Sequence, residues 1–212
     1  MIRRLARAVL AGGRRLYTSG ALQLFAIPAI PCPELDPADR SCLNDLQAIA
    51  LYQPSGLSDM SAKEFAQVVR RRLSAGHSIF AVQMDGRLAH YRWLSRTGRT
   101  YVDDATGLEY EFPVATRVVF DVFTHPAARR RGLQQRSTAS ALCEAGLEGL
   151  PAVHIFVEHD NAASKRNIMR VGASYVGSVW STRILGRTRH WTNLPSSFHV
   201  RAAGLDVTEV AR

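Results

Sequence analysis

Hydrophobic residues in the first third of the chain follow one strand-like period and then two helical periods. The run ALQLFAIPA, residues 21–29, is apolar and is stopped by nearby prolines, which predicts a strand. Apolar residues then recur at helical spacing within 38–52, which predicts a first helix. The residues SAKE, 61–64, form a capping box ahead of a one-sided apolar pattern, which predicts a second helix over 61–74. The Arg70–Arg72 run in that helix is interpreted as a solvated face.

The middle of the chain is patterned as antiparallel strands. Two apolar stretches, 78–83 and 87–95, flank Asp85-Gly86, and this composition at a two-residue turn is a strong signal of a β-hairpin. Another strand is predicted near 108–112. The run TRVVFDVFT, 116–124, is β-branched and almost continuously apolar, which is typical of a central strand.

The last part of the chain alternates helices and strands. A helix is predicted from about Arg131 to Leu147, and a second over 161–171, which Asp160 can cap and Gly172 closes. The remaining strands are predicted at 152–158, at 174–180 and at 181–191, with a turn at Gly186-Arg187. This order of elements predicts a mixed α/β fold with one sheet. The predicted organisation is a basic arm at 1–20, one domain at 21–195, and a weakly patterned tail at 196–212.

Composition narrows the classes of function. The chain has 212 residues, 46% of them hydrophobic, and a formal net charge of +9. No apolar run approaches about 18 residues, so a membrane-spanning helix is not predicted. The three cysteines show no CxxC pairing and His154 and His159 have no metal-like partners, so neither a metal site nor a disulfide framework is predicted, and a reducing, cytoplasmic compartment fits. The excess of arginine favours anionic partners: nucleotides, phosphorylated cofactors, nucleic acid or anionic lipid.

The first twenty residues contain five arginines and no acidic residue. Three interpretations stay open for them: a helix that docks on the domain, a helix on a membrane surface, or an organelle presequence. The docked or surface helix is preferred. Contact with the anionic inner face of a membrane is therefore one prediction for this arm.

The stretch FTHPAARRRGLQQ, residues 123–135, has the physical requirements of a phosphate-binding loop. A strand leads into a turn and a helix, and the first N–H groups of a helix are unpaired and carry partial positive charge. Gly132 lets an anion approach the backbone closely, and the arginines before it supply forked donors. Neither GxGxxG nor GK[ST] is present, so this is not a Rossmann or Walker loop. The alternative is an ordinary helix start that is rich in arginine.

These residues resemble the GNAT superfamily of N-acetyltransferases. Its central motif is Q/R-x-x-G-x-G/A after a strand, and this chain has Arg129, two further arginines, Gly132 and Leu133, with Gln134 at the usual Gly or Ala position. The stretch VEHDNAASKRNIMRVGASYVG, 157–177, resembles the strand, Asn-started helix and glycine turn that follow in the family. The resemblance covers about 75–185.

The resemblance implies acetyl-CoA, or another acyl-CoA, as the donor, and no metal. Backbone groups of Val122, Phe123 and Thr124 would pair with the pantetheine arm, and the thioester would lie between strands 116–124 and 152–158. Asn161, with Ser164 nearby, would meet the pantetheine or the adenine side. The pyrophosphate would be held by the loop and the first turn of the helix: Arg129, Arg130, Arg131, Gly132, Leu133, Gln134 and Gln135.

Attack of an amine on a thioester requires a group that removes a proton. The two candidate bases are Asp121, which interrupts an apolar strand, and Glu158, which ends another. The structural alternatives are an ion pair for Asp121 and a solvated strand end for Glu158. Many relatives carry a tyrosine acid seven residues after the helix-start Asn, where this chain has Ile168, so Tyr175 and Tyr91 are the substitutes to consider.

The acceptor side is the least determined part of the sequence. His90, Tyr91 and Trp93 lie on one predicted strand that could line it, and the alternative is that the aromatic residues are core while the polar ones face outward.

We expect an acyl-CoA-dependent N-acetyltransferase for a small amine or amino sugar, because the loop looks most like bacterial members found near surface-polysaccharide genes. Resemblance also suggests a homodimer. The alternatives are a peptide or protein N-acetyltransferase, a non-catalytic acyl-CoA sensor, and, on charge alone, a nucleic-acid-binding protein, for which the sequence signals are missing.

Overall fold

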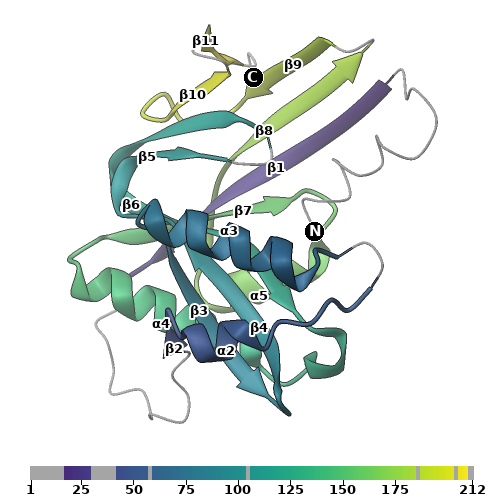
Figure 1. The fold of residues 1–212 in the computed structure, drawn as a ribbon. Coiled ribbons are helices and arrows are strands. Elements are labelled where there is room, and N and C mark those ends of the chain that lie inside the picture. The colour runs from purple at the N-terminus through teal and green to yellow at the C-terminus, as the bar shows by residue number, and fades with distance from the viewer. Residues whose placement is uncertain are drawn as a thin grey trace. The chain divides into compact units, whose positions relative to one another are not determined.

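A computed structural model describes residues 17–29, 42–56, 59–103, 106–184, 187–202 and 205–209 (Figure 1). The chain forms two compact units. The first consists of residues 1–27, 98–116 and 154–212, and the second of residues 28–97 and 117–153. Residues 1–16 of the predicted basic arm lie outside the described residues.

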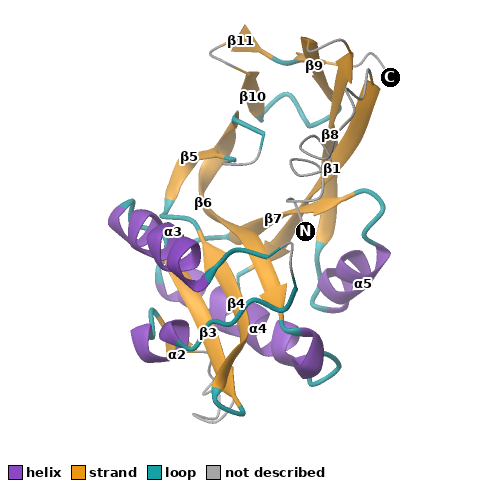
Figure 2. Cartoon of the chain, turned by 45° about the vertical axis from the view of Figure 1, so that its right-hand side comes forward, coloured by secondary structure: helices purple, strands orange, loops and turns teal. Residues whose placement is uncertain are grey.

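The second unit is a four-stranded antiparallel sheet with helices on both faces. The strands follow the order β6-β4-β3-β2, where β2 is Cys42–Leu43, β3 is Ser78–Met84, β4 is Arg87–Leu94 and β6 is Leu108–Thr124. Helices α2 (Leu46–Ala50) and α3 (Ala62–Ser74) pack on one face through a core that includes Phe65, Tyr91 and Trp93. Helix α4 (Leu133–Leu147) lies against β3 and β4 on the other face (Figure 2).

Two predictions for this unit are confirmed because they depend on local chemistry. Ser61 is the N-cap of α3, its hydroxyl accepts from Glu64 N, and the Glu64 carboxylate accepts from Ser61 N. Asp85 and Gly86 join β3 to β4 with φ values of 52° and 68°, the left-handed pair that this hairpin turn requires.

The helix predicted within 38–52 is shorter than expected in the described residues 42–52, since α2 covers only Leu46–Ala50; residues 38–41 lie outside the described residues. Asn44 has φ 55°, and its side-chain oxygen accepts from Ile79 N at 2.9 Å, which holds it out of a helical path. Asp45 then starts the helix, because its carboxylate accepts from the N–H groups of Gln47 and Ala48.

The first unit contains further strands and helix α5, and its strands belong to the same sheet as those of the second unit. One edge-to-edge path runs β12-β9-β8-β1-β7, and the first part of β6 pairs with β5 and β10. The pairs β1–β8, β8–β9, β5–β6, β6–β10 and β10–β11 are antiparallel, whereas β9 and β12 are parallel. The bounds are β1 Tyr17–Pro28, β5 Gly98–Val102, β7 Ala152–Glu158, α5 Ala162–Arg170, β8 Ser174–Ile184, β9 Arg187–Thr192, β10 His199–Ala202, β11 Leu205–Asp206 and β12 Thr208–Glu209.

Several boundaries in the first unit differ from the sequence prediction. The strands predicted at 108–112 and 116–124 are one 17-residue strand, β6. Strand β5 was not predicted, and β1 begins at Tyr17, inside the predicted arm. The tail contributes β10 to β12, and β10 pairs with β6 through Val200 and Tyr110, so weak patterning there reflects short strands rather than missing structure.

Three further observations bear on the expectations from composition. No helix in the described part of the chain is long and apolar enough to cross a membrane. Within the same residues, no group of three or more His, Cys, Asp or Glu side chains is arranged to hold a metal ion. Cys143, a buried residue of α4, is disulfide-bonded, so the prediction that the cysteines form no disulfide framework does not hold for this residue.

Candidate functional site

The predicted phosphate loop joins the end of β6 to the start of α4 within the second unit. A single 3-10 turn, η2 (Pro126–Ala128), follows the strand. Arg130 and Gly132 then adopt left-handed φ values of 65° and 72°. Gly132 is the N-cap of α4 and offers no side-chain acceptor to the N–H groups of the first turn. The helix therefore begins with donors that no capping side chain covers, which is the arrangement that binds anions.

The loop is anchored by Leu133, whereas its arginines remain on the surface. Leu133 is buried against Ala89 and Ala128, which fixes the first residue of α4 on the β3–β4 hairpin. Arg131 extends to the hairpin turn, where its Nη1 lies 3.9 Å from Asp85 Oδ2. Arg129 and Arg130 are exposed. The side chains of Arg129 and Arg130 can therefore attract an anion at the surface without any rearrangement of the core.

A buried hydrogen-bond chain links the end of β6 to the first turns of α4. His90 on β4 is fully buried, with its Nδ1 2.8 Å from Thr124 Oγ1 and its Nε2 2.7 Å from Ser137 Oγ. Ser137 Oγ also donates to Gln134 O at 3.1 Å, which continues the chain into the first turn of α4. Burial, with the nearby Arg92 charge as a second cause, lowers the pKa of His90 to about 3. His90 is therefore neutral and structural at neutral pH.

Arg92, two residues further along β4, is also fully buried. Its Nη2 donates to Gln134 O at 3.2 Å, while Nε and Nη1 have no hydrogen-bond partner. Burial lowers the pKa of Arg92 to about 9. The same Gln134 carbonyl also accepts from Thr138 Oγ1 at 2.7 Å. Gln134, which replaces the usual small residue of the motif, thus acts here through its backbone carbonyl.

Sequence reasoning missed Arg92. The expectation that the polar residues of this strand face outward is wrong, because α4 covers the face that carries His90 and Arg92. One signal in the sequence could have indicated this. His90 and Arg92 alternate with the large apolar residues Tyr91 and Trp93 in a strand that also contains buried Leu88 and Ala89, as is typical of a strand covered on both faces. Helices on both faces leave neither set of side chains exposed.

Tyr91 and Trp93, predicted as candidates for the acceptor side, lie in the core instead. Both are at most 5% exposed, on the face that α2 and α3 cover. The Tyr91 ring lies 5.2 Å from that of Phe65 and 5.4 Å from that of Phe123. Their described contacts are those of packing residues.

Asp121, one of the two candidate bases, lies in an irregular part of β6. The register with β4 shifts at this point, and Asp121 has a left-handed φ of 45°. Its carboxylate is paired with Arg72 Nη1 on α3 at 2.5 Å, and the Arg72 guanidinium lies 5.1 Å from the Trp93 ring centre. The interpretation of Arg70–Arg72 as a solvated face is therefore wrong for Arg72, because its side chain is drawn inward by this ion pair and the aromatic ring.

The other predicted residues belong to the first unit, at the junction of β7 and α5. Glu158 ends β7 and is partly buried. Asn161, rather than the expected Asp160, is the N-cap of α5, and its side chain accepts from Ser164 N at 3.1 Å. In the structure, Asn161 caps α5 through this hydrogen bond to Ser164.

The tyrosine substitutes differ in accessibility. Ile168, at the position where relatives carry a tyrosine, is 1% exposed. Tyr175 is 49% exposed, with its hydroxyl 2.7 Å from Ser178 Oγ, whereas Tyr91 is buried. Only Tyr175, of these two, presents its ring at the surface.

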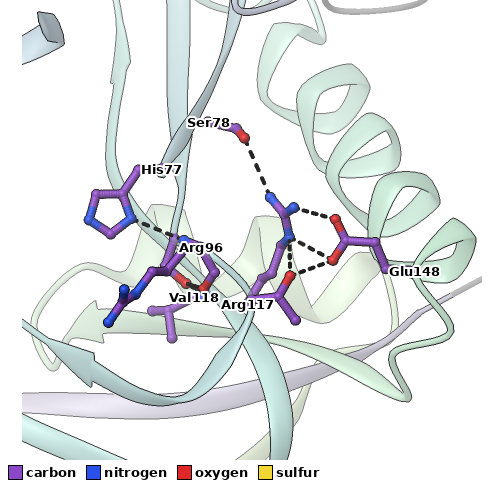
Figure 3. A network of polar contacts seen from close by, with 8 residues as sticks. His77, Ser78, Arg96, Arg117, Val118 and Glu148 are labelled. Atoms are coloured by element: carbon purple, nitrogen blue, oxygen red, sulfur yellow. Dashed lines mark hydrogen bonds and ion pairs between the residues drawn. The ribbon is translucent and has the colours of Figure 1, made fainter. Parts of the chain in front are cut away.

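A second polar network fixes the far end of α4 (Figure 3). Arg117 on β6 forms an ion pair with Glu148, the C-cap of α4, and its Nε also donates to Thr97 Oγ1 at 3.0 Å. Its Nη1 reaches Ser78 Oγ at 3.5 Å. The helix is therefore held by side chains at both ends, which keeps its start in a defined position under the loop.

Comparison with known proteins supports the fold and leaves the activity open. No protein-family model matches the sequence, and no curated protein matches it significantly. Among solved structures, a protein described as an acetyltransferase of the GNAT family from Novosphingobium aromaticivorans matches with a TM-score of 0.52 and 16% identity, over 82% of this chain and 70% of that one. A GNAT-family acetyltransferase from Colwellia psychrerythraea matches with a TM-score of 0.51 and 12% identity, over 85% and 61%.

At these identities the likeness shows the fold alone. The predicted fold class, a mixed α/β domain with a large, mostly antiparallel sheet flanked by helices, is confirmed, and it is the fold of the GNAT acetyltransferases. The chain spans less than two thirds of the length of the Colwellia protein.

Proposed function

We propose that this protein is an acetyl-CoA-dependent N-acetyltransferase that moves the acetyl group directly to the amine of a small molecule or amino sugar. The observation that supports this most is the uncapped start of α4 behind Gly132, in a fold shared with acetyltransferases. A Cβ built on Gly132 would meet only Gln135 Oε1, at 3.8 Å, so the backbone here is open to a ligand. A diphosphate fits this chemistry, because it accepts hydrogen bonds from helix N–H groups and is attracted by the helix dipole.

In this proposal the N–H groups at the start of α4 hold the pyrophosphate of CoA, and exposed Arg129 and Arg130 add attraction. The end of β6 binds the pantetheine arm. His125 N donates to Ala89 O at 2.9 Å, so strand alternation turns the N–H and C=O of Thr124 away from β4. Those groups are then directed to the side of β6 away from β4, where we propose that the extended arm pairs with the backbone like a strand.

The chemistry requires a base and gives Glu158 and Asp121 different roles. The amine nitrogen attacks the thioester carbon, the C–N bond forms, the C–S bond breaks, and the CoA thiolate leaves. A carboxylate takes the proton from the amine, and the thiolate is protonated by water or by Tyr175. Accepting a proton would cost Asp121 its ion pair with Arg72. The ion pair favours a structural role for Asp121, and Glu158 is kept as the base that the sequence predicts.

A non-catalytic acyl-CoA sensor is the second candidate. It is favoured by Ile168, which places a buried aliphatic side chain where relatives carry a tyrosine acid, and by the engagement of Asp121 in an ion pair. Such a protein would bind acetyl-CoA and release no free thiol.

The test is release of CoA thiol from acetyl-CoA in the presence of amino sugars, small amines and a peptide with a free N-terminus. We expect turnover with at least one amino sugar or small amine. Glu158→Gln should lower kcat by about 100-fold or more, which is the usual scale of general base catalysis. Asp121→Asn should keep kcat within about tenfold but reduce the free energy of unfolding by about 1–3 kcal/mol, because Arg72 loses its partner.

Three other outcomes would each change the proposed function or the proposed residue roles. Turnover only with the peptide would move the acceptor class to polypeptides. Binding of acetyl-CoA without any turnover would favour the sensor. A kcat that falls with Asp121→Asn and survives Glu158→Gln would exchange the roles of the two carboxylates.

A further inference from the structure

Arg92 carries a buried charge whose hydrogen-bonding capacity is mostly unused. Its side chain is fully buried, yet only Nη2 has a partner, the carbonyl of Gln134. Nε and Nη1 have none, and no described carboxylate forms an ion pair with Arg92. A guanidinium that is removed from water without a counter-ion is costly, and buried charges are normally paired.

The position of this charge makes the cost larger in the ligand-free protein. The group that Arg92 contacts lies in the first turn of α4, the end of the helix that carries partial positive charge. The charge and the helix dipole therefore have the same sign at the same place. The other titratable group beside it, His90, is neutral and offers no compensation.

Both the buried charge of Arg92 and the positive end of the helix dipole become favourable when an anion binds at the start of α4. A buried charge is poorly screened by water, so it acts on a nearby anion more strongly than a surface arginine does. The hydrogen bond to Gln134 O also fixes the turn that presents the helix N–H groups. The arrangement is unfavourable alone and favourable with a multiply charged anion.

We propose that Arg92 is a positioning residue for the diphosphate at the start of α4, where it orients the first turn through Gln134 O and supplies a buried positive charge that the ligand neutralises. This inference rests on the proposed binding of acetyl-CoA. It adds a determinant that lies outside the loop motif and on a different strand, 42 residues away in sequence from its hydrogen-bond partner.

The test compares coenzyme A with pantetheine, which lacks the phosphates, by titration calorimetry on the full chain. Arg92→Met preserves length and apolar packing but removes the charge. We expect it to weaken binding of coenzyme A by about tenfold or more and to leave pantetheine binding within about twofold. Arg92→Lys, which keeps a charge, should recover part of the loss.

Thr138→Val is the matched control. It removes another donor to the same Gln134 carbonyl without changing any charge, so coenzyme A affinity should stay within about twofold. The ligand-free Arg92→Met protein should melt no lower than wild type, because an incompletely paired buried charge has been removed.

The outcomes separate this inference from the proposed function. If wild type binds coenzyme A and Arg92→Met binds it equally well, the inference is overturned while the proposed function stands. Equal loss of coenzyme A and pantetheine, or loss with Thr138→Val of the same size, would show a purely structural role and overturn it as well. If wild type does not bind coenzyme A, both fail.

Discussion

Unfolding of the His90→Gln variant should depend on acid much less steeply than unfolding of the wild type. The pKa of His90 is about 3 in the folded protein and about 6.5 in the unfolded chain. Between these values the unfolded state binds a proton that the folded state does not, so stability is full above pH 6.5 and falls as pH decreases. One such group contributes a slope of about 1.4 kcal/mol per pH unit, and therefore several kcal/mol across the window.

Denaturant unfolding at steps from pH 7 to about pH 3 measures this slope. The variant lacks the titrating ring, so the difference between the two curves should grow as pH decreases, whatever the absolute stability of the variant. His154→Gln is the matched case in the first unit. Burial lowers the pKa of His154 to about 4, so its effect should level off at a higher pH than that of His90. Parallel curves for wild type and His90→Gln would contradict the assignment of a neutral, buried His90.

Replacing Gly132 should weaken binding of coenzyme A and, with a β-branched residue, should also destabilise the fold. Gly132 has φ 72°, and a β-branched residue is strongly disfavoured in this left-handed region. Gly132→Val should therefore lower the free energy of unfolding by about 2 kcal/mol, and Gly132→Asn by less, because Asn tolerates this conformation. Space is not the cause of the loss in stability, since the position of the added Cβ is open.

Both substitutions should weaken coenzyme A binding by about tenfold or more, because each puts a side chain where the diphosphate must approach the backbone. Calorimetric titration on each folded variant gives the affinity, and thermal unfolding gives the stability. If Gly132→Asn bound coenzyme A with wild-type affinity, the backbone of this loop would not be the contact surface. Loss in Gly132→Val alone would instead indicate a conformational effect.

The sequence was most informative where structure depends on adjacent residues. The capping box at Ser61 and Glu64, the Asp85-Gly86 turn and the loop before α4 are all local, and each is found in the structure. The loop proposed to bind phosphate could be located for the same reason, because a strand, a glycine and a helix start follow one another directly in the sequence.

The contacts that support the loop could not be read in this way. His90 meets Ser137 and Arg72 meets Asp121 across 47 and 49 residues. The alternation of side chains along β4 correctly predicts which residues share a face. It does not show that helices cover both faces, so it could not predict that Arg92 is buried. In the same way, the apolar period over 38–52 did not show that Asn44 leaves the helical path to bond Ile79.

Thermal unfolding with and without acetyl-CoA tests the central claim most directly. At about 100 times its dissociation constant, a ligand that binds only the folded state stabilises it by roughly 2.7 kcal/mol, or about 5–10 °C for a chain of this size. We predict a shift of that order in wild type with acetyl-CoA, little shift with pantetheine at equal concentration, and a reduced shift with acetyl-CoA in Gly132→Val. No shift in wild type with acetyl-CoA or with longer acyl-CoAs would contradict the account, and the likeness to acetyltransferases would then extend to the fold alone.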